Sequence, residues 1–164
     1  MTPQTRGTLK HSEILDPDWS RYPNTVLAFE AAGAGADEVC VDLRRPLDEA
    51  ALRALTRLGL DDPFAVITAH DPHGENFDGE QNEKRAAGLE ETLRSQGLVF
   101  HQVNACSPDA EHCEASVAVK MPLAAARQLA HDYGQVAFFW FDGQRFWIAG
   151  GIVETDPIAL PRVP

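Results

Sequence analysis

The apolar run from Phe64 to Ala69 constrains this chain more than any other stretch. Its six residues read FAVITA, with Pro63 before them and the polar loop HDPHGEN after them. A short, continuous apolar run between turn residues is typical of a strand that is buried on both faces. The run therefore predicts such a strand at Phe64–Ala69.

Most side chains that can take part in chemistry gather directly after this strand. The loop contributes His70, Asp71, His73, Glu75 and Asn76. A helix is predicted to follow, over Glu80–Gln96, ending at Gly97. On its helical wheel Asn82 lies in the middle of the apolar arc and Arg85 at its edge. Leaving either side chain buried and unpaired costs about 1 to 3 kcal/mol, so both need partners.

Periodicity and turn residues place the remaining elements along the chain. The stretch Thr25–Ala31 is too short for periodicity to decide between a strand and a helix. The residues 104–112 are predicted to form a loop, and Asp142–Gly143 a hairpin turn. Strands are predicted at Glu38–Leu43, Leu98–Val103, Glu114–Lys120, Val136–Phe141 and Arg145–Ala149, and helices at Leu47–Leu58 and from Pro122 to Tyr133.

From Phe64 onward the order is strand-helix-strand twice, followed by a hairpin partner. Two halves of this kind predict an α+β fold, in which one mixed α/β sheet has helices packed on it. A ferredoxin-like arrangement is the simplest case, and the earlier strand and helix would extend it. We expect a single domain over 25–152, an irregular arm over 1–24 and an extended, Pro-rich tail over 153–164.

Net charge and apolar runs exclude several classes of function. The formal charge of -11 repels phosphate backbones, so nucleic-acid binding is not expected. No apolar run reaches the roughly 18 to 20 residues that span a bilayer, and the N-terminus lacks a secretory segment. The three cysteines, Cys40, Cys106 and Cys113, are an odd and low count that suits a reducing compartment. A cytoplasmic location is therefore expected, without a membrane partner.

The polar residues after the central strand allow a structural and a functional interpretation. In the structural one, Asn82 braces the loop and Arg85 pairs with Asp71 or Glu114. In the functional one, Asn82, Arg85 and the free N–H groups of the helix N-terminus bind a polar or anionic small molecule. Buried polar groups are usually satisfied within the protein, so the two interpretations carry similar weight.

Histidines in the same loop suggest more specific chemistry. His70 or His73 would act as a general acid or base, with Asp71 orienting the imidazole. Two metal sites are weaker alternatives, because neither matches a known ligand spacing. They are His70-x-x-His73 with a nearby carboxylate, and the group His101, Cys106, His112 and Cys113. We therefore predict no metal and no cofactor.

Four short motifs follow one another along the chain. They are Thr68-Ala69-His70-Asp71-Pro72, Asn82-Glu83-Lys84-Arg85, Glu114-Ala115-Ser116 and Tyr133-Gly134-Gln135, followed by Trp140 in a strand. In these motifs residues 64–149 resemble a bacterial family, the domain of unknown function 3293 (DUF3293). Asp71 stands where the family pattern has Asn, and Val117 where Phe is expected. The resemblance supports the fold and the site position, and it adds Glu114, Ser116 and Gln135 as ligand-binding residues.

The sequence thus describes an uncharacterised protein with two candidate functions. The first is a small-molecule binding protein, or a hydrolase- or transferase-type enzyme, with its site at the 68–85 loop and helix start. The alternative is a non-catalytic protein–protein interaction module that uses the acidic surface and the Pro-rich tail. Homodimerisation is left open.

Overall fold

The computed structural model describes residues 9–10, 22–30, 38–72, 75 and 77–161. Its centre is an eight-stranded sheet in the order β10-β8-β7-β4-β6-β5-β2-β3, in which neighbouring strands are antiparallel. The strands of this sheet are β2 (Val26–Phe29), β3 (Val39–Asp42), β4 (Phe64–Thr68), β5 (Phe100–Cys106), β6 (Cys113–Lys120), β7 (Ala137–Phe141), β8 (Phe146–Gly150) and β10 (Ile158–Ala159). A separate parallel pair joins β1 (Leu9–Lys10) to β9 (Val153–Glu154).

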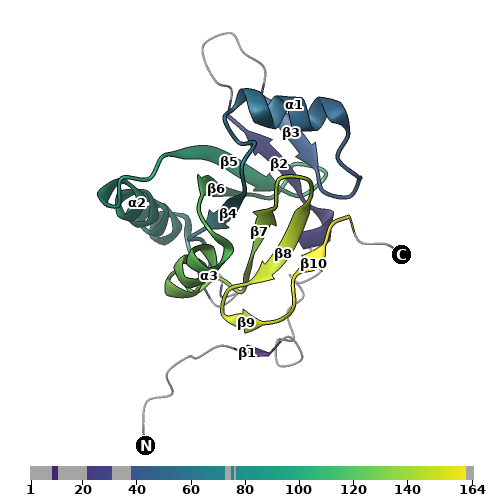
Figure 1. The fold of residues 1–164 in the computed structure, drawn as a ribbon. Helices are drawn as coiled ribbons and strands as arrows, with labels where there is room; N and C mark the ends of the chain where they lie inside the picture. Colours follow the sequence, from purple (N-terminus) through teal and green to yellow (C-terminus); the bar gives the residue numbers. More distant parts are fainter. Residues whose placement is uncertain (1–8, 11–21, 31–37, 73–74, 76, 162–164) are drawn as a thin grey trace, which may run out of the picture.

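Helices cover both faces of this curved sheet (Figure 1). The apolar residues of α2 (Gly79–Ser95) and α3 (Leu123–Asp132) pack in one core cluster with Ile67 of β4. Those of α1 (Glu49–Arg57) pack in a second cluster with Phe64 and Val66. The central strand β4 therefore contributes to both clusters, which confirms the predicted strand buried on both faces.

The α+β fold class is confirmed, but the prediction of a mixed sheet is wrong. The two helical crossovers do join parallel strands. β4 and β5 are parallel because both are antiparallel to β6, and β6 and β7 are parallel because both are antiparallel to β4. Another strand lies between the members of each such pair, however: β6 separates β4 from β5, and β4 separates β6 from β7. Each strand therefore has antiparallel neighbours. The four central strands are β7, β4, β6 and β5. The sheet extends beyond them at both edges, and it curls.

Several element boundaries differ from the expected ones for local reasons. The stretch after Thr25 forms a strand, β2, between β3 and β5. Helix α1 begins later than Leu47, because the Asp48 side chain accepts a hydrogen bond from the backbone N–H of Ala51 and caps it. The predicted loop over 104–112 is shorter, since β5 and β6 stay paired as far as Cys106 and Cys113. Most of the predicted arm over 1–24 lies outside the described residues.

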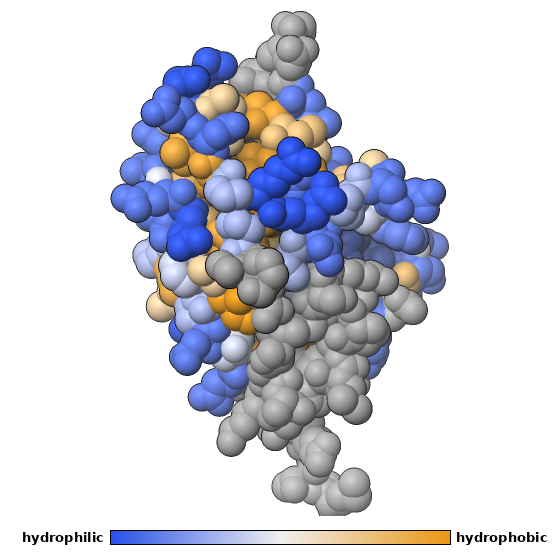
Figure 2. Space-filling model, turned by 90° about the vertical axis from the view of Figure 1, so that its right-hand side faces the viewer, coloured by the Kyte–Doolittle hydropathy of each residue, from blue (hydrophilic) through white to orange (hydrophobic). Residues whose placement is uncertain are grey.

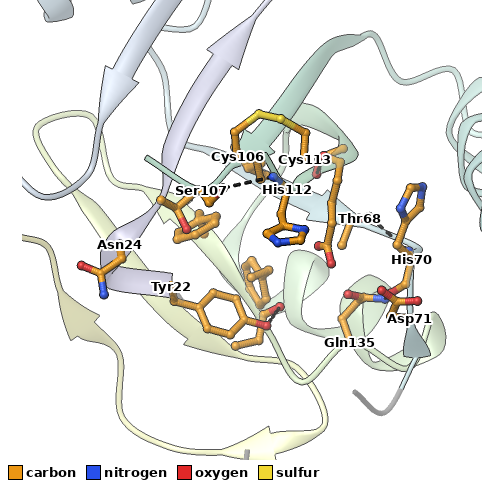
Figure 3. Close-up of a pocket in the computed structure, with 18 of the residues that line it drawn as sticks. Tyr22, Asn24, Thr68, His70, Asp71, Cys106, Ser107, His112, Cys113 and Gln135 are labelled. Carbon is orange, nitrogen blue, oxygen red and sulfur yellow. Dashed lines mark hydrogen bonds between the residues drawn. A yellow bond between two sulfur atoms is a disulfide. The ribbon is translucent and has the colours of Figure 1, made fainter. Parts of the chain in front are cut away.

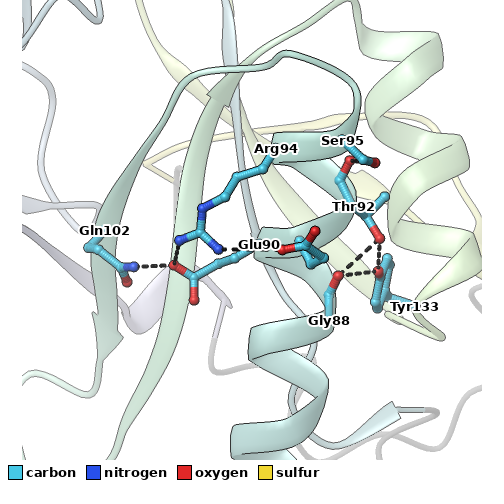
Figure 4. A network of polar contacts seen from close by, with 8 residues as sticks. Gly88, Glu90, Thr92, Arg94, Ser95, Gln102 and Tyr133 are labelled. Carbon is cyan, nitrogen blue, oxygen red and sulfur yellow. Dashed lines mark hydrogen bonds and ion pairs between the residues drawn. The ribbon is translucent and has the colours of Figure 1, made fainter.

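Polar contacts hold α2 on the sheet at two sides (Figure 4). On one side the Gln102 side chain of β5 donates to Glu90, which also lies 3.8 Å from Arg94. On the other side the Thr92 and Tyr133 hydroxyls are 2.7 Å apart, and each lies within hydrogen-bonding distance of the Gly88 carbonyl, at 2.9 Å and 3.1 Å. These contacts hold the C-terminal half of α2 against β5 and against the end of α3.

The surface seen in Figure 2 is dominated by hydrophilic residues that surround the apolar ones, in line with the net charge of -11. Among the described residues, the exposed large hydrophobic side chain is that of Val99, which is 80% exposed. None of the helices described there is both long and apolar enough to cross a membrane.

Candidate functional site

A cavity of about 630 Å³ lies at the end of β4, on the sheet face that also packs against α1. Val66 and Thr68 of β4 and Phe139 of β7 form part of its wall. The 3-10 helix η3 (Tyr22–Asn24) and the loop between β5 and β6 close it from other directions. Segments that are distant in the sequence thus converge on one hollow (Figure 3).

Most of the predicted site residues lie in this lining. They are His70, Asp71, Asn82, Glu114, Ser116 and Gln135. Arg85 does not line the cavity, and His73 lies outside the described residues. Residues of the polar loop, β6 and the turn before β7 therefore lie together at one cavity, and Arg85 lies outside its lining.

Asn82 braces the loop through Asp71. The Asn82 Oδ1 accepts from the backbone N–H of Asp71 at 3.0 Å, and its Nδ2 donates to Asp71 Oδ1 at 3.1 Å. The same Asp71 oxygen accepts from the backbone N–H of Phe77 at 2.9 Å. Asp71 has a φ of 46°, a left-handed conformation that Asn and Asp adopt more readily than other side-chain-bearing residues. Either residue at this position therefore fits the backbone and supplies the acceptor oxygen.

Asp71→Ala is expected to lower the free energy of unfolding by about 2 kcal/mol, because it removes two accepted hydrogen bonds and places alanine at a positive φ. Asp71→Asn is expected to stay within about 1 kcal/mol of the wild type, since it keeps the oxygen and tolerates the conformation. Urea denaturation measures both. Equal losses in the two variants would contradict the role assigned to the side-chain oxygen and the backbone conformation.

Arg85 binds backbone carbonyls rather than a carboxylate. Its Nε donates to the Ala69 carbonyl at 2.6 Å, and its Nη2 donates to the Tyr133 carbonyl at 2.5 Å. The guanidinium carbon also lies 5.8 Å from the centre of the Phe77 ring and 5.9 Å from that of Tyr133. Arg85 therefore joins the start of α2 to the end of β4 and to the turn before β7. The pairings with Asp71 or Glu114 considered from the sequence are not the ones formed.

Gln135 is 95% buried from solvent, since its exposed fraction is 5%. Its Nε2 donates to the His70 carbonyl at 2.9 Å and to the Tyr133 carbonyl at 3.3 Å. Gly134 precedes it with a φ of 69°, which allows the chain to turn from α3 into β7. The turn places the Gln135 amide against the cavity beside Asp71 and His70 (Figure 3).

These contacts join the four sequence motifs into one junction. Arg85 connects the first, second and fourth motifs through Ala69 and Tyr133. The Thr68 hydroxyl connects the first to the third, because it donates to the Ala115 carbonyl at 2.9 Å. The Ser116 hydroxyl donates to the Glu114 carbonyl at 3.1 Å. The motifs therefore maintain the shape of the cavity wall as well as lining it.

His70 is half-buried in this wall, and burial lowers the pKa of its imidazole below the usual 6.5, although the Asp71 charge acts in the opposite direction. The imidazole is therefore mainly neutral near pH 7 and available to accept a proton. The Asp71 carboxylate is directed to Phe77 and Asn82, and its recorded hydrogen bonds do not include the His70 ring. The expected orienting role of Asp71 is therefore not supported by a contact.

The lowered pKa of His70 predicts a pH dependence of stability. Above pH 6.5 the imidazole is neutral in both states; below it the unfolded chain binds a proton more readily than the folded one. The free energy of unfolding should therefore fall as the pH drops through 6.5 toward the lower folded-state pKa. His70→Gln should reduce this fall, measured by urea denaturation at a series of pH values. An unchanged pH dependence in the variant would contradict the assignment.

Sequence reasoning did not place two residues that point into the cavity. Figure 3 shows the His112 ring extending toward its middle from the loop between β5 and β6, and the Tyr22 ring entering from η3. The Tyr22 hydroxyl donates to the Ala137 carbonyl at 3.4 Å. No local pattern indicates these positions, because both depend on chain segments that fold back over the sheet.

A disulfide between Cys106 and Cys113 closes the loop that carries His112. Both cysteines are paired residues of adjacent strands, which brings their sulfur atoms together. The sequence analysis left Cys106 and Cys113 unpaired, as possible metal ligands, and this is corrected. Cys40 stays a free thiol. The cysteine count consequently no longer argues for a reducing compartment.

Metal ligands were a weaker expectation for this region. Among the described residues, no three His, Cys, Asp or Glu side chains are grouped so that they could hold a metal ion. The suggested group of His101, Cys106, His112 and Cys113 contains two sulfur atoms that are bonded to each other. His70-x-x-His73 is not tested, because His73 is outside the described residues.

Comparison with known proteins places the central part of the chain in a family context. The family described as "Protein of unknown function (DUF3293)" matches residues 67–138. This match confirms the resemblance inferred from the four motifs, over a somewhat shorter range than 64–149. No curated protein and no solved structure is significantly similar to the chain. The family carries no assigned activity, so the match does not identify a function.

Proposed function

We propose that this protein binds a small polar molecule in the cavity at the end of β4. The observation that carries the proposal is the cavity itself, about 630 Å³ and lined by polar groups from several distant segments. Its volume lies within the roughly 300 to 1,000 Å³ of small-molecule sites. The junction around Asp71, Asn82 and Arg85 supports the wall, so the cavity is held open by contacts that do not depend on the ligand.

A hydrolytic or group-transfer reaction is the chemistry that we propose if the bound molecule is converted. His70 supports this, because a neutral imidazole near pH 7 can accept a proton from water or a hydroxyl group. Asp71 acts in this proposal by holding the loop that carries His70, through the hydrogen bonds to Asn82 and Phe77. His112 is a second imidazole at the same cavity.

The test uses a blocked cavity and a matched control on the same strand. Ala105 of β5 lines the cavity, and the neighbouring Asn104 is exposed and does not. Successive residues of a strand point to opposite faces. Ala105→Trp should fill the cavity, and Asn104→Trp should leave it open.

Thermal unfolding in the presence of a library of metabolites should reveal compounds that raise the melting temperature of the wild type. Ala105→Trp should abolish this rise, and Asn104→Trp should retain it. A rise that persists unchanged in Ala105→Trp would place binding elsewhere. The absence of any stabilising compound would argue against a small-molecule function.

A protein–protein interaction module is the alternative function, and it has less support. A docking face usually includes exposed apolar residues, whereas Val99 is the large exposed hydrophobic residue recorded among those described. Homodimerisation and a cytoplasmic location stay proposals based on the sequence.

The strand order β7-β4-β6-β5, with α2 and α3 on one face, supports a ferredoxin-like centre for the extended sheet.

A further inference from the structure

We propose that the Cys106–Cys113 disulfide is a redox-active pair that exchanges with small thiols in the cavity. This inference rests on the proposed small-molecule function, and it names a substrate class and a reaction for that site. The reaction, thiol–disulfide exchange, is distinct from the chemistry proposed for His70. Both cysteines line the cavity, and their sulfur atoms are bonded to each other. Figure 3 shows the disulfide beside His112.

The disulfide is open to attack. Cys113 is exposed at the start of β6, and Cys106 is only partly buried at the end of β5. Neither cysteine belongs to the two core clusters of the described residues. Exchange begins when a thiolate reaches one of the two sulfur atoms, so exposed disulfides are commonly the labile or catalytic ones. The position of this bond therefore allows it to react in the folded protein.

The loop that the disulfide closes is also held by other contacts. The backbone N–H of Ser107 donates to the His112 carbonyl at 2.8 Å, and that of Ala110 donates to the Ser107 carbonyl at 2.8 Å. The backbone N–H of His112 donates to the Ser107 hydroxyl at 3.1 Å. The two cysteines are themselves register partners in the paired strands β5 and β6. Opening the S–S bond therefore leaves residues 107–112, and the cavity wall that they form, in place.

A purely structural role would bring little benefit at this position. The stabilisation that a disulfide gives grows with the length of the loop it closes. Here the two cysteines are separated by only seven positions in the sequence. The bond joins strands that are already neighbours, and this arrangement suits a bond that is made and broken during function.

An imidazole in the same cavity can activate the incoming thiol. His112 precedes Cys113 in the sequence, and its ring extends toward the middle of the cavity (Figure 3). A thiol attacks a disulfide as its thiolate, and imidazole is the side chain suited to accept a proton near neutral pH. A thiol that enters the cavity loses its proton to His112 and attacks the more exposed sulfur, Cys113 Sγ.

The exchange transfers two electrons in two steps. The first thiolate forms a bond to Cys113 Sγ, the bond between the cysteines breaks, and Cys106 leaves with the proton that His112 accepted. A second thiol then attacks the small-molecule sulfur of the mixed disulfide, and its proton passes to Cys113 as that residue leaves. The cysteine pair is thereby reduced, and the two small thiols are oxidised to their disulfide. The reverse sequence restores the bond.

The experiment measures reduction of the full chain by dithiothreitol near neutral pH. Cys40 is replaced by serine in every sample, because it carries the free thiol. Alkylation and mass spectrometry count the thiols that form, while circular dichroism follows the fold. The disulfide should be reduced about tenfold faster than oxidised glutathione under the same conditions, and the reduced protein should stay folded.

Two pairs of variants test the cavity and the base. His112→Gln should slow reduction several-fold near neutral pH, and the difference should shrink above about pH 9, where thiols ionise unaided. His101→Gln is its control, since His101 of β5 does not line the cavity, and should leave the rate unchanged. Ala105→Trp, which fills the cavity, should slow reduction, and Asn104→Trp should not.

The outcomes separate this inference from the proposed function. A disulfide that resists dithiothreitol until urea unfolds the chain would be structural and would overturn the inference. Equal rates in the parent, His112→Gln and Ala105→Trp would mean attack from bulk solvent and would also overturn it. In both cases a metabolite whose stabilising effect Ala105→Trp abolishes would retain the cavity as a binding site. If the disulfide does not react and no metabolite binds, both proposals fail.

Discussion

Replacing Phe64 by alanine is expected to lower the free energy of unfolding by about 4 kcal/mol, within the range of about 3 to 5 kcal/mol for Phe→Ala in cores. Phe64 is 0% exposed at the start of β4. Its ring centre lies 5.1 Å from that of Phe141, 5.8 Å from Phe146 and 6.2 Å from Phe29. The substitution removes all three ring contacts and leaves a cavity where strands from distant parts of the chain meet.

Urea denaturation followed by circular dichroism measures this loss. Phe64→Leu should cost clearly less, about 1 to 1.5 kcal/mol, because it keeps most of the apolar volume. Val99→Ala is the matched control, since Val99 is 80% exposed and its truncation should change stability by less than about 0.5 kcal/mol. Similar values for Phe64→Ala and Val99→Ala would contradict the position of β4 at the centre of the core.

Arg85→Ala is expected to lower the free energy of unfolding by about 3 kcal/mol. The change removes two hydrogen bonds from a charged donor, each of which contributes about 1.5 to 3 kcal/mol, and leaves the carbonyls of Ala69 and Tyr133 without that donor. It also removes the guanidinium from the Phe77 and Tyr133 rings. Because Arg85 is only half-buried, we place the loss below the sum of these contributions.

Lys84→Ala provides the control on the same turn of α2. Lys84 is exposed and forms an ion pair with Glu80 at 3.5 Å, in which both side chains are largely exposed. Such pairs contribute about 0.2 to 0.5 kcal/mol. Arg85→Lys should fall between the two, because an ammonium cannot reproduce the forked geometry of a guanidinium. If Arg85→Ala is as stable as Lys84→Ala, Arg85 does not support the junction.

The candidate site was predictable as a region but not in its contacts. Helical periodicity indicated that Asn82 points inward and needs a partner, and Asp71 is that partner. The same reasoning placed Arg85 at the edge of the apolar arc. It did not indicate backbone carbonyls as the acceptors, because Tyr133 is 48 residues away in sequence.

The sequence by itself determined the α+β class, the buried central strand at Phe64, the helices that flank it and the polar loop that leads into the helix of Asn82. These features follow from local periodicity, turn residues and caps, which act over a few residues. The tertiary structure decided the antiparallel strand order and turned Arg85 away from the cavity. It also decided that Tyr22 and His112 face the cavity (Figure 3). These outcomes depend on which distant segments become neighbours, and a periodic pattern records only which face of an element is buried.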